Sequence, residues 1–249
     1  MAPNEIYQYS IVTALLDGVA ENGLPLTDLL KHGDHGLGTF RHLEGEMIVL
    51  DGIVYQMRSD GSVTAVDLPS ASASKQTETA VAPFAMITHF QPAQSTQAVL
   101  SDKADLHSLV AFLLPEAHNV YLSFRIHGRF RSITVRTVGG QTKPHEGLTE
   151  VGAHQTSNTF EEDPPIEGTI FGFRSPAYMQ NVSVAGDHLH FISADRRKGG
   201  HLLALVSDGE VTVEVAPAYK FHLELPAHDD EFNDAQLQGD SEAIAAVEG

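Results

Sequence analysis

Hydrophobic and polar residues alternate along most of this chain, with the two-residue period of β-strands. After Thr39, short alternating segments are separated by turn dipeptides at 44–45, 51–52 and 60–61, a pattern typical of a β-meander. The segment 120–138 also alternates, and its His127-Gly128 pair predicts two strands joined by a tight turn. Further strands are expected in 82–90, 166–179, 181–195, 201–216 and 219–226.

Helical spacing of apolar residues is confined to short segments. One helix is expected around Ala14 and Leu15, and a second begins at Thr27 and ends at Gly33. A third covers 102–113, with Ser101 or Asp102 as its N-cap and Pro115 after its end. The pattern therefore predicts an α+β fold (α/β in the broad sense) of mostly mixed and antiparallel β-sheets with a few helices.

The end of the third helix near Pro115 divides the chain into two parts. Residues 1–115 contain the helices and the β-meander, and residues 116–249 are β-rich. The polar segments 69–81 and 139–165 are interpreted as loops, and the acidic segment from residue 228 as a solvated tail.

Composition and charge limit the possible chemistry. The chain has no cysteine, so a bound metal needs imidazole or carboxylate ligands. Its formal charge of −18 argues against a nucleic acid or an anionic membrane as partner, because both recruit clustered cations. No apolar segment is long enough to span a bilayer and no export signal is visible at the first residues, so we expect a soluble cytoplasmic protein.

Three histidines near residue 195 are the strongest candidates for chemistry. His188 and His190 are separated by one residue on an expected strand, so both imidazoles point to the same face. A hairpin turn at 193–200 returns the chain so that His201 supplies a third nitrogen. Exposed strand histidines would show the first spacing too, but the third histidine favours a metal with open coordination positions.

Spacing alone leaves several functions open. Carbonic-anhydrase-like hydration, a cupin-like oxygenase and a lyase that polarises a carbonyl all use such a triad. The cupin motif usually continues with a glutamate, and none follows His190 within ten residues. A non-enzymatic metal-storage or carbohydrate-binding β-protein is a further alternative. The turn between His190 and His201 carries three cations, Arg196, Arg197 and Lys198. They favour an anionic substrate, and the alternative is that they only keep the turn soluble.

Several stretches along nearly the whole chain resemble the α-acetolactate decarboxylases. The most specific are "HGDHGLGTF" and "FRSPAYMQNVSVAGDHLHFISADRRKGGH", and "IYQYSIVTALLDGV", "LEGEMIVLDGIVYQMRSDG", "PFAMITHF", "VRTVGGQTKP" and "AIAAVEG" occur in matching order. His35 is a departure, because a hydrophobic aromatic residue is expected at its position, and it affects the rim of the expected pocket.

The resemblance implies a set of site residues. His188, His190 and His201 correspond to the zinc ligands of the family. Its catalytic residues correspond to Thr39, Glu46, Arg136 and, near the C-terminus, Glu248, for which Glu242 is a rival. Without the resemblance, Glu46 and Arg136 would be interpreted as solvated charges.

The resemblance also implies the activity: a carboxy-lyase, acetolactate decarboxylase, that converts (S)-2-acetolactate to (R)-acetoin and CO2. In this scheme Zn2+ chelates the ketone and hydroxyl oxygens and stabilises an enediolate. Arg136 holds the carboxylate, and Glu46 or Glu248 relays a proton. The family further implies two domains, which we place at residues 1–115 (α/β, with the β-meander) and 116–249 (β-rich and metal-binding). It also implies a homodimer, with no organic cofactor and a role in acetoin formation. The sequence does not show which enantiomer is preferred.

Overall fold

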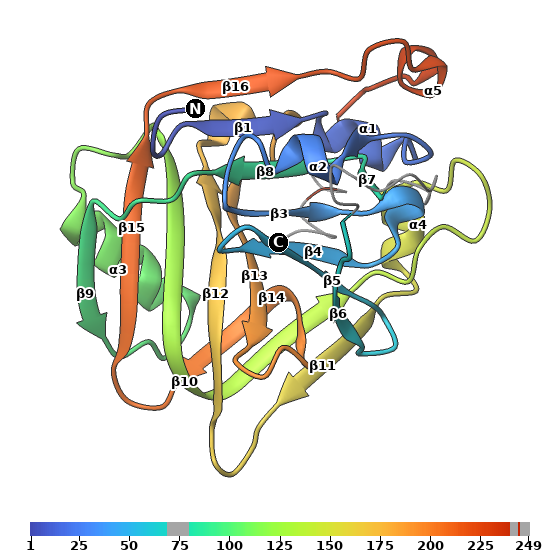
Figure 1. The fold of residues 1–249 in the computed structure, drawn as a ribbon. Coiled ribbons are helices and arrows are strands. Elements are labelled where there is room, and N and C mark those ends of the chain that lie inside the picture. The colour runs from blue at the N-terminus through green and yellow to red at the C-terminus, as the bar shows by residue number, and fades with distance from the viewer. Residues whose placement is uncertain (69–79, 240–243, 245–249) are drawn as a thin grey trace.

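The computed structural model describes residues 1–68, 80–239 and 244 (Figure 1). Among these residues, two sheets dominate and the helices are short, which confirms the expected α+β class of mostly antiparallel strands. No helix in the described part of the chain is both long enough and apolar enough to cross a membrane.

The first sheet contains the predicted meander. Within the described residues it has seven strands in the order β16-β1-β8-β3-β4-β5-β6, all antiparallel neighbours except β1 and β16. Its strands are β1 (Ile6–Tyr9), β3 (His35–Thr39), β4 (Glu46–Leu50), β5 (Ile53–Met57), β6 (Val63–Ala65), β8 (Ala85–Thr88) and β16 (Phe221–Glu224). The meander β3 to β6 is therefore confirmed.

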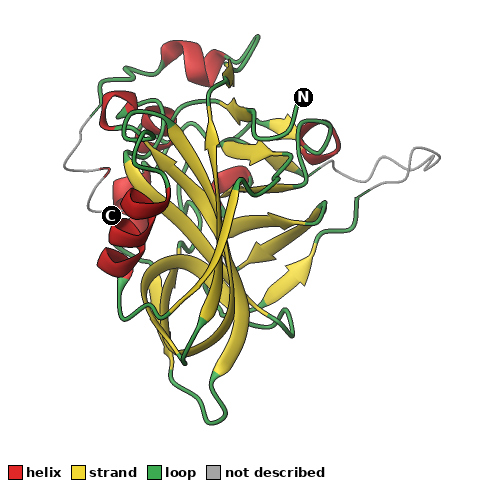
Figure 2. Ribbon diagram, turned by 90° about the vertical axis from the view of Figure 1, so that its left-hand side faces the viewer, coloured by secondary structure: helices red, strands yellow, loops and turns green. Residues whose placement is uncertain are grey.

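The second sheet also has seven strands among the described residues. They are β9 (Gln94–Ala98), β10 (Tyr121–Thr137), β11 (Thr156–Phe160), β12 (Ile166–Ser175), β13 (Gly186–Ser193), β14 (Gly199–Ser207) and β15 (Val211–Ala218). The strands β10, β12, β13 and β14 pair in a closed circuit, since β10 is hydrogen-bonded to both β12 and β14. Figure 2 shows the strong curvature that this closure produces.

The two strands predicted around His127 and Gly128 are one strand, so that prediction was wrong. β10 runs through Gly128, which pairs with Gly168 of β12. The strand changes partners instead of reversing: its first half pairs with β12 and β15, and its second half with β14 and β11. Irregular pairing with β14 after Phe130 accommodates the bend.

The described α-helices are α1 (Val12–Leu16), α2 (Leu26–Leu29), α3 (Lys103–Leu113), α4 (Leu148–Gly152) and α5 (Asp230–Asp234). Two short 3-10 helices are η1 (Arg41–Leu43) and η2 (Ala177–Met179). A small separate pair of strands is formed by β2 (Leu24–Pro25) and β7 (Val81–Ala82). Asp102 is the N-cap of α3, because its carboxylate accepts a hydrogen bond from the backbone N–H of Asp105. It is one of the two N-cap residues that the sequence predicted. The segment 139–165 is not an extended loop, because it contains α4 and β11.

Both faces of the second sheet are buried, which determines where polar side chains can lie. One face packs with the first sheet and α1 around Ile48, Phe84 and Phe171. The opposite face packs against α3 around Leu106 and Phe191. A polar residue whose side chain lies within either of these cores is therefore removed from water and needs a partner.

The sheets exchange strands across the predicted boundary. β9 precedes Pro115 and belongs to the second sheet, whereas β16 follows it and belongs to the first. The division at Pro115 stays a prediction. The acidic C-terminal segment is more than a solvated tail, because Phe232 of α5 is buried against Ala14 and Val19, and Ile244 is buried in the core between the sheets. The expected loop 69–81 lies mostly outside the described residues, although Val81 belongs to β7.

Candidate metal centre

Strand β13 presents two of the expected histidines to the same face. His188 and His190 point toward the core between the two sheets, and the intervening Leu189 points to the opposite face. Their partners on β12, Phe173 and Phe171, pack in the core between the sheets. The alternation of the sequence therefore places two imidazoles in a largely apolar interior.

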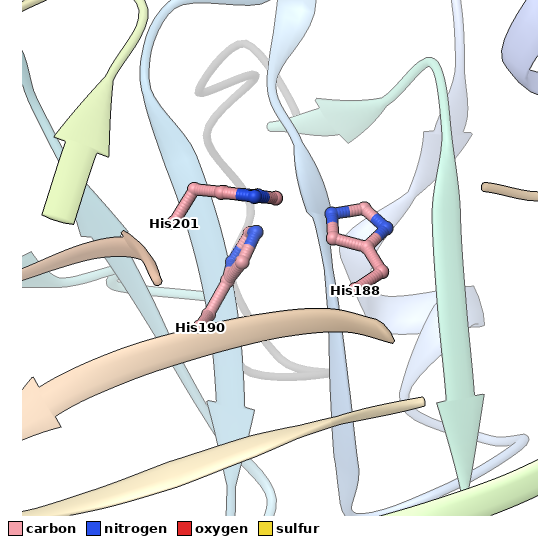
Figure 3. Close-up of side chains that lie close together, drawn as sticks. All are labelled: His188, His190 and His201. Carbon is pink, nitrogen blue, oxygen red and sulfur yellow. The ribbon is translucent and has the colours of Figure 1, made fainter. Parts of the chain in front are cut away.

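The hairpin from β13 to β14 adds the third histidine, as the sequence predicted. His201 lies directly opposite His190 in the register of the two strands. The three rings point toward one another (Figure 3), with centroids separated by 5.1 to 5.4 Å. One nitrogen from each ring lies within 4.8 Å of the others. The cluster can hold a metal ion.

Burial keeps all three imidazoles neutral. The side chains are at most 5% exposed. Burial, reinforced by the nearby positive charge of Arg136, holds the pKa of His188 and of His201 well below the usual value. Burial lowers the pKa of His190 to about 4. Neutral nitrogens with lone pairs are the form that binds a metal.

A backbone carbonyl fixes the tautomer of His190. Nδ1 of His190 lies 2.7 Å from the carbonyl oxygen of Met47, so this nitrogen carries the proton and donates. Nε2 is then the lone-pair nitrogen, and it is buried without a hydrogen bond among the described residues. Metal-binding histidines commonly donate their second ring nitrogen in this way. The donor set therefore fits a metal such as zinc.

The first sheet supplies Thr39 and Glu46. These residues are paired directly across β3 and β4, so both side chains point to the core between the sheets. A carboxylate oxygen of Glu46 lies 3.6 Å from Nε2 of His190. The hydroxyl of Thr39 donates to the carbonyl oxygen of Gly45, which holds the turn that precedes Glu46. Both expected residues thus lie beside the histidines.

Arg136 lies on the other side of the cluster. It is directly opposite His201 in the pairing of β10 with β14, and its side chain is buried. His190, His201 and Arg136 therefore form a row across three neighbouring strands. A buried guanidinium beside neutral histidines gives this end of the site a positive charge that suits a carboxylate.

A small cavity opens beside His188, Thr39 and Glu46. It has a volume of about 20 Å3, which is room for one water molecule. The rest of its wall is apolar and includes Leu15 of α1, Leu43, Phe84, Val138, Leu148 of α4 and Val184. Sequence reasoning missed this wall and the carbonyl of Met47, because neither apolar residues nor backbone atoms carry a recognisable motif.

Other candidates lie elsewhere or outside the described residues. Arg196 lies over the ring of Tyr55 and donates to the carbonyl oxygen of Ser193, so it belongs to the hairpin turn. His35 is buried between Asp34 and Arg125 and does not line the cavity beside His188. Glu242 and Glu248 lie outside the described residues.

Comparison with known proteins identifies the family. The family model described as alpha-acetolactate decarboxylase matches residues 6–239. The alpha-acetolactate decarboxylase of Raoultella terrigena is 40% identical over 98% of this chain and 89% of the relative, and that of Methanosarcina mazei is 37% identical over 99% and 81%. The crystal structure of the Bacillus subtilis alpha-acetolactate decarboxylase superposes with a TM-score of 0.88 at 34% identity, covering 98% of this chain and 99% of that one. The chain therefore belongs to the alpha-acetolactate decarboxylase family.

Proposed function

We propose that this protein is a zinc-dependent decarboxylase that converts 2-acetolactate to acetoin and CO2. The observation that supports it best is the group of His188, His190 and His201, buried and neutral, with Glu46 and Arg136 on either side. These three neutral imidazoles would hold Zn2+ and leave its full charge available, so the ion would supply a Lewis acid to the reaction. Membership of the family supports the substrate.

The residues of the chain have separate tasks in this proposal. Arg136 binds the carboxylate that will leave, since it is the buried cation beside His201. When the C–C bond to the carboxylate breaks, its electron pair forms a double bond to the ketone carbon, the π electrons of the ketone pass to its oxygen, and CO2 departs. Glu46, whose carboxylate lies next to His190, then takes up a proton from water and passes it to the carbon that lost CO2. Thr39 orders the turn that positions Glu46.

Three parts of the proposal rest on the family resemblance. Glu248 is the proposed second carboxylate, with Glu242 as its rival. The preference for the (S)-substrate and the (R)-product follows the family, and so does a homodimer. A cytoplasmic location remains our expectation from the sequence.

Acetoin formation tests the proposal directly. The purified protein is incubated with 2-acetolactate, and acetoin and CO2 are measured before and after removal of metal by a chelator. We expect equal amounts of both products, loss of turnover on chelation and recovery with Zn2+. An oxygenase would consume O2, so an oxygen electrode trace that stays flat separates the decarboxylase from the cupin-like alternative. Formation of acetoin at the uncatalysed rate would contradict the proposal.

A further inference from the structure

Two cavities lie on opposite sides of a thin partition beside the metal centre. The inner cavity, beside His188, is lined by Leu43, Val138 and Leu148 among other residues. The outer cavity is at the surface, and its lining residues are Glu21, Asn22, His42, Gln141, Thr142, Lys143, Pro144, His145 and Glu231. His42 and Leu43 are consecutive in η1, and residues 141–145 lie in the chain between Val138 and Leu148. The partition therefore consists of η1 and of residues 139–147, which we call the cover segment.

Substrate can reach the metal centre only if part of its surroundings moves. His188, His190, His201 and Arg136 are at most 5% exposed, so a small acid in solvent does not touch them. Strands β3, β4, β13 and β14 are held in hydrogen-bonded ladders, whereas the cover segment belongs to no strand or helix. Segments without such ladders open at the lowest cost in free energy, so the cover segment is the part of the wall that we expect to move.

The cover segment has internal bonds that let it move as one body. The carboxylate of Glu146, which is buried, accepts hydrogen bonds from the backbone N–H of Thr142 at 2.6 Å and from its hydroxyl at 2.9 Å. The side chain of Gln141 donates to the carbonyl oxygen of Glu146 at 3.0 Å. The last residue, Gly147, is the N-cap of α4 and packs against the carbonyl oxygen of Leu16 in α1. A displacement that pivots at this end preserves the internal bonds.

Gln141 joins the cover segment to the rest of the protein. Its backbone N–H donates to the carbonyl oxygen of His42 at 2.7 Å, and its side-chain amide donates to that of Gly18 at 2.8 Å. Elsewhere in the segment, Nδ1 of His145 lies 2.9 Å from a carboxylate oxygen of Glu231 in α5. The side chain of His145 is two-thirds exposed, and such pairs contribute little to stability. The main polar link therefore comes from Gln141.

The fixed side of the partition is η1, which lies between β3 and β4. Its backbone is strained, because His42 and Leu43 are consecutive residues with positive φ angles of 59° and 56°. Strained backbone of this kind persists only where its surroundings fix it, and it clusters at functional sites. On the moving side, Gly140 directly precedes Gln141 and lacks the Cβ that restricts other residues, as hinge residues often do. One side of the partition is thus held, and the other has a hinge.

We propose that the cover segment is a gate through which the substrate, a small carboxylate anion, passes from the outer cavity to the metal centre, and that Gln141 is a positioning residue that holds the gate closed. This inference rests on the proposed function, which supplies the metal centre and its ligand. Opening of the gate breaks the side-chain bond from Gln141 to Gly18. A neutral hydrogen bond contributes roughly 2- to 13-fold to such an equilibrium, so its loss should speed ligand entry by about that factor.

The rate of ligand association tests the gate in the wild type, in Q141A and in a control variant, Q97A. The probe is 2,3-dihydroxy-2-methylbutanoate, the unreactive analogue of 2-acetolactate in which the ketone is reduced. Surface plasmon resonance gives its association rate constant for the zinc-loaded protein. Gln97 is matched because its side-chain amide also donates a hydrogen bond, to Thr212, but on β9 at the edge of the second sheet.

We expect the association rate constant to rise by about 2- to 13-fold in Q141A and to keep the wild-type value in Q97A. If Q141A does not fold, Q141E should give a rise in the same direction, because glutamate has the length of glutamine but no donor. Equal association rate constants in the wild type and in the folded Gln141 variants would overturn the gate.

Narrowing of the surface cavities near the metal centre tests the route. A second surface cavity is lined by His35 and Thr169 among other residues, and it lies behind Phe171, which contacts His35 and is paired with His190. N22W places a large ring in the outer cavity and should slow association of the analogue. T169W places the same ring in the second cavity and should leave the rate constant unchanged. The opposite result, or an equal effect of both variants, would exclude the outer cavity as the route.

Hydrogen exchange separates a gate from a general loss of stability. Q141A should speed exchange of the amides in the cover segment and leave those of β13 and β14 at the wild-type rates. An equal acceleration in β13 and β14 would show that Gln141 only stabilises the fold, which contradicts its role in the gate. If the wild type neither binds the analogue nor forms acetoin, the proposed function fails, and the exchange result alone decides whether the cover segment opens.

Discussion

The imidazole of His190 donates to the backbone carbonyl of Met47, with 2.7 Å between Nδ1 and the oxygen. This bond joins the two sheets, since Met47 belongs to β4 and His190 to β13. It also brings Glu46, the residue before Met47, beside the histidine cluster. This contact between strands that are far apart in sequence therefore helps to align the histidine cluster with Glu46.

Replacement of His190 by alanine should abolish metal binding. The variant loses one of the three proposed nitrogen ligands and also the bond to Met47. Elemental analysis of the purified protein after dialysis should find much less than one zinc per chain. His127→Ala is the control, because His127 is half-exposed on β10 and lies outside the cluster, and it should keep the wild-type content. Stoichiometric zinc in the His190 variant would refute the assignment.

Glu46→Gln should retain the fold and the metal but lose turnover. Glutamine is similar in size to glutamate, but it cannot donate the proton that completes the reaction, and such transfers contribute roughly 100- to 10,000-fold. We expect kcat to fall by about 100-fold or more while zinc content is unchanged. Glu44→Gln is matched, since Glu44 is exposed two residues away, and its kcat should equal that of the wild type. Comparable rates for both variants would remove Glu46 from the mechanism.

The sequence was sufficient for the histidines because strand periodicity and hairpin geometry are local. His188 and His190 share a face by alternation, and His201 returns through a short turn. It was not sufficient for β10, where the His127-Gly128 pair resembles a turn and the strand continues by changing partners. That outcome depends on the neighbouring strands, which local spacing does not describe.

The position of Glu46 beside the histidines could not be predicted from the local sequence pattern either. A glutamate at the start of a strand is usually solvated, and only the packing of the first sheet against the second brings it to His190. The family resemblance supplied this residue, and the structure supplies the reason for its position. The apolar wall of the cavity could not be predicted from the sequence, because nothing there distinguishes Leu15 and Leu148 from other core leucines.

Gly147→Ala should destabilise the protein by about 1 to 3 kcal/mol, a typical cost of overpacking. The φ angle of Gly147 is −69°, which alanine adopts readily, so the effect isolates the overlap with the carbonyl oxygen of Leu16. Gly139→Ala provides the comparison, since a methyl group there meets only ordinary contacts. Urea unfolding measures both variants. Equal free energies of unfolding for the two variants would show that α1 and α4 can move apart without a loss of stability.

The ion pair of Glu5 with Lys220 should make the pairing of β1 with β16 depend on pH. The hydrogen bond from Lys220, at 2.6 Å, is the main reason that the pKa of Glu5 is lowered to about 2. A lowered pKa means that the contribution to stability is complete above the unfolded value of 4.5 and is lost as the pH falls toward 2. The free energies of unfolding of the wild type and of Glu5→Gln should therefore differ at pH 7, and this difference should shrink below about pH 4.5. A difference that is constant over this range would exclude the ion pair as its source.

Asp187→Ala should destabilise the protein more than any exposed acid does. Asp187 lies next to His188 on the opposite face of β13, where its carboxylate accepts two bonds from Arg174, at 2.6 and 3.0 Å, and lies 3.1 Å from His107. Its side chain is only 2% exposed, so alanine leaves the guanidinium of Arg174 without its buried counter-charge.

Loss of one partner from a buried ion pair costs about 3 to 5 kcal/mol, and we expect the lower end because Arg174 retains some access to water. Asp208→Ala is the matched change at a partly exposed pair, with Arg129 at 3.2 Å, and it should cost less than about 1 kcal/mol. Free energies of unfolding from urea titrations compare the two directly. Similar small losses would mean that β13 does not depend on Asp187, and that the histidines on its other face are held by the pairing of the strands alone.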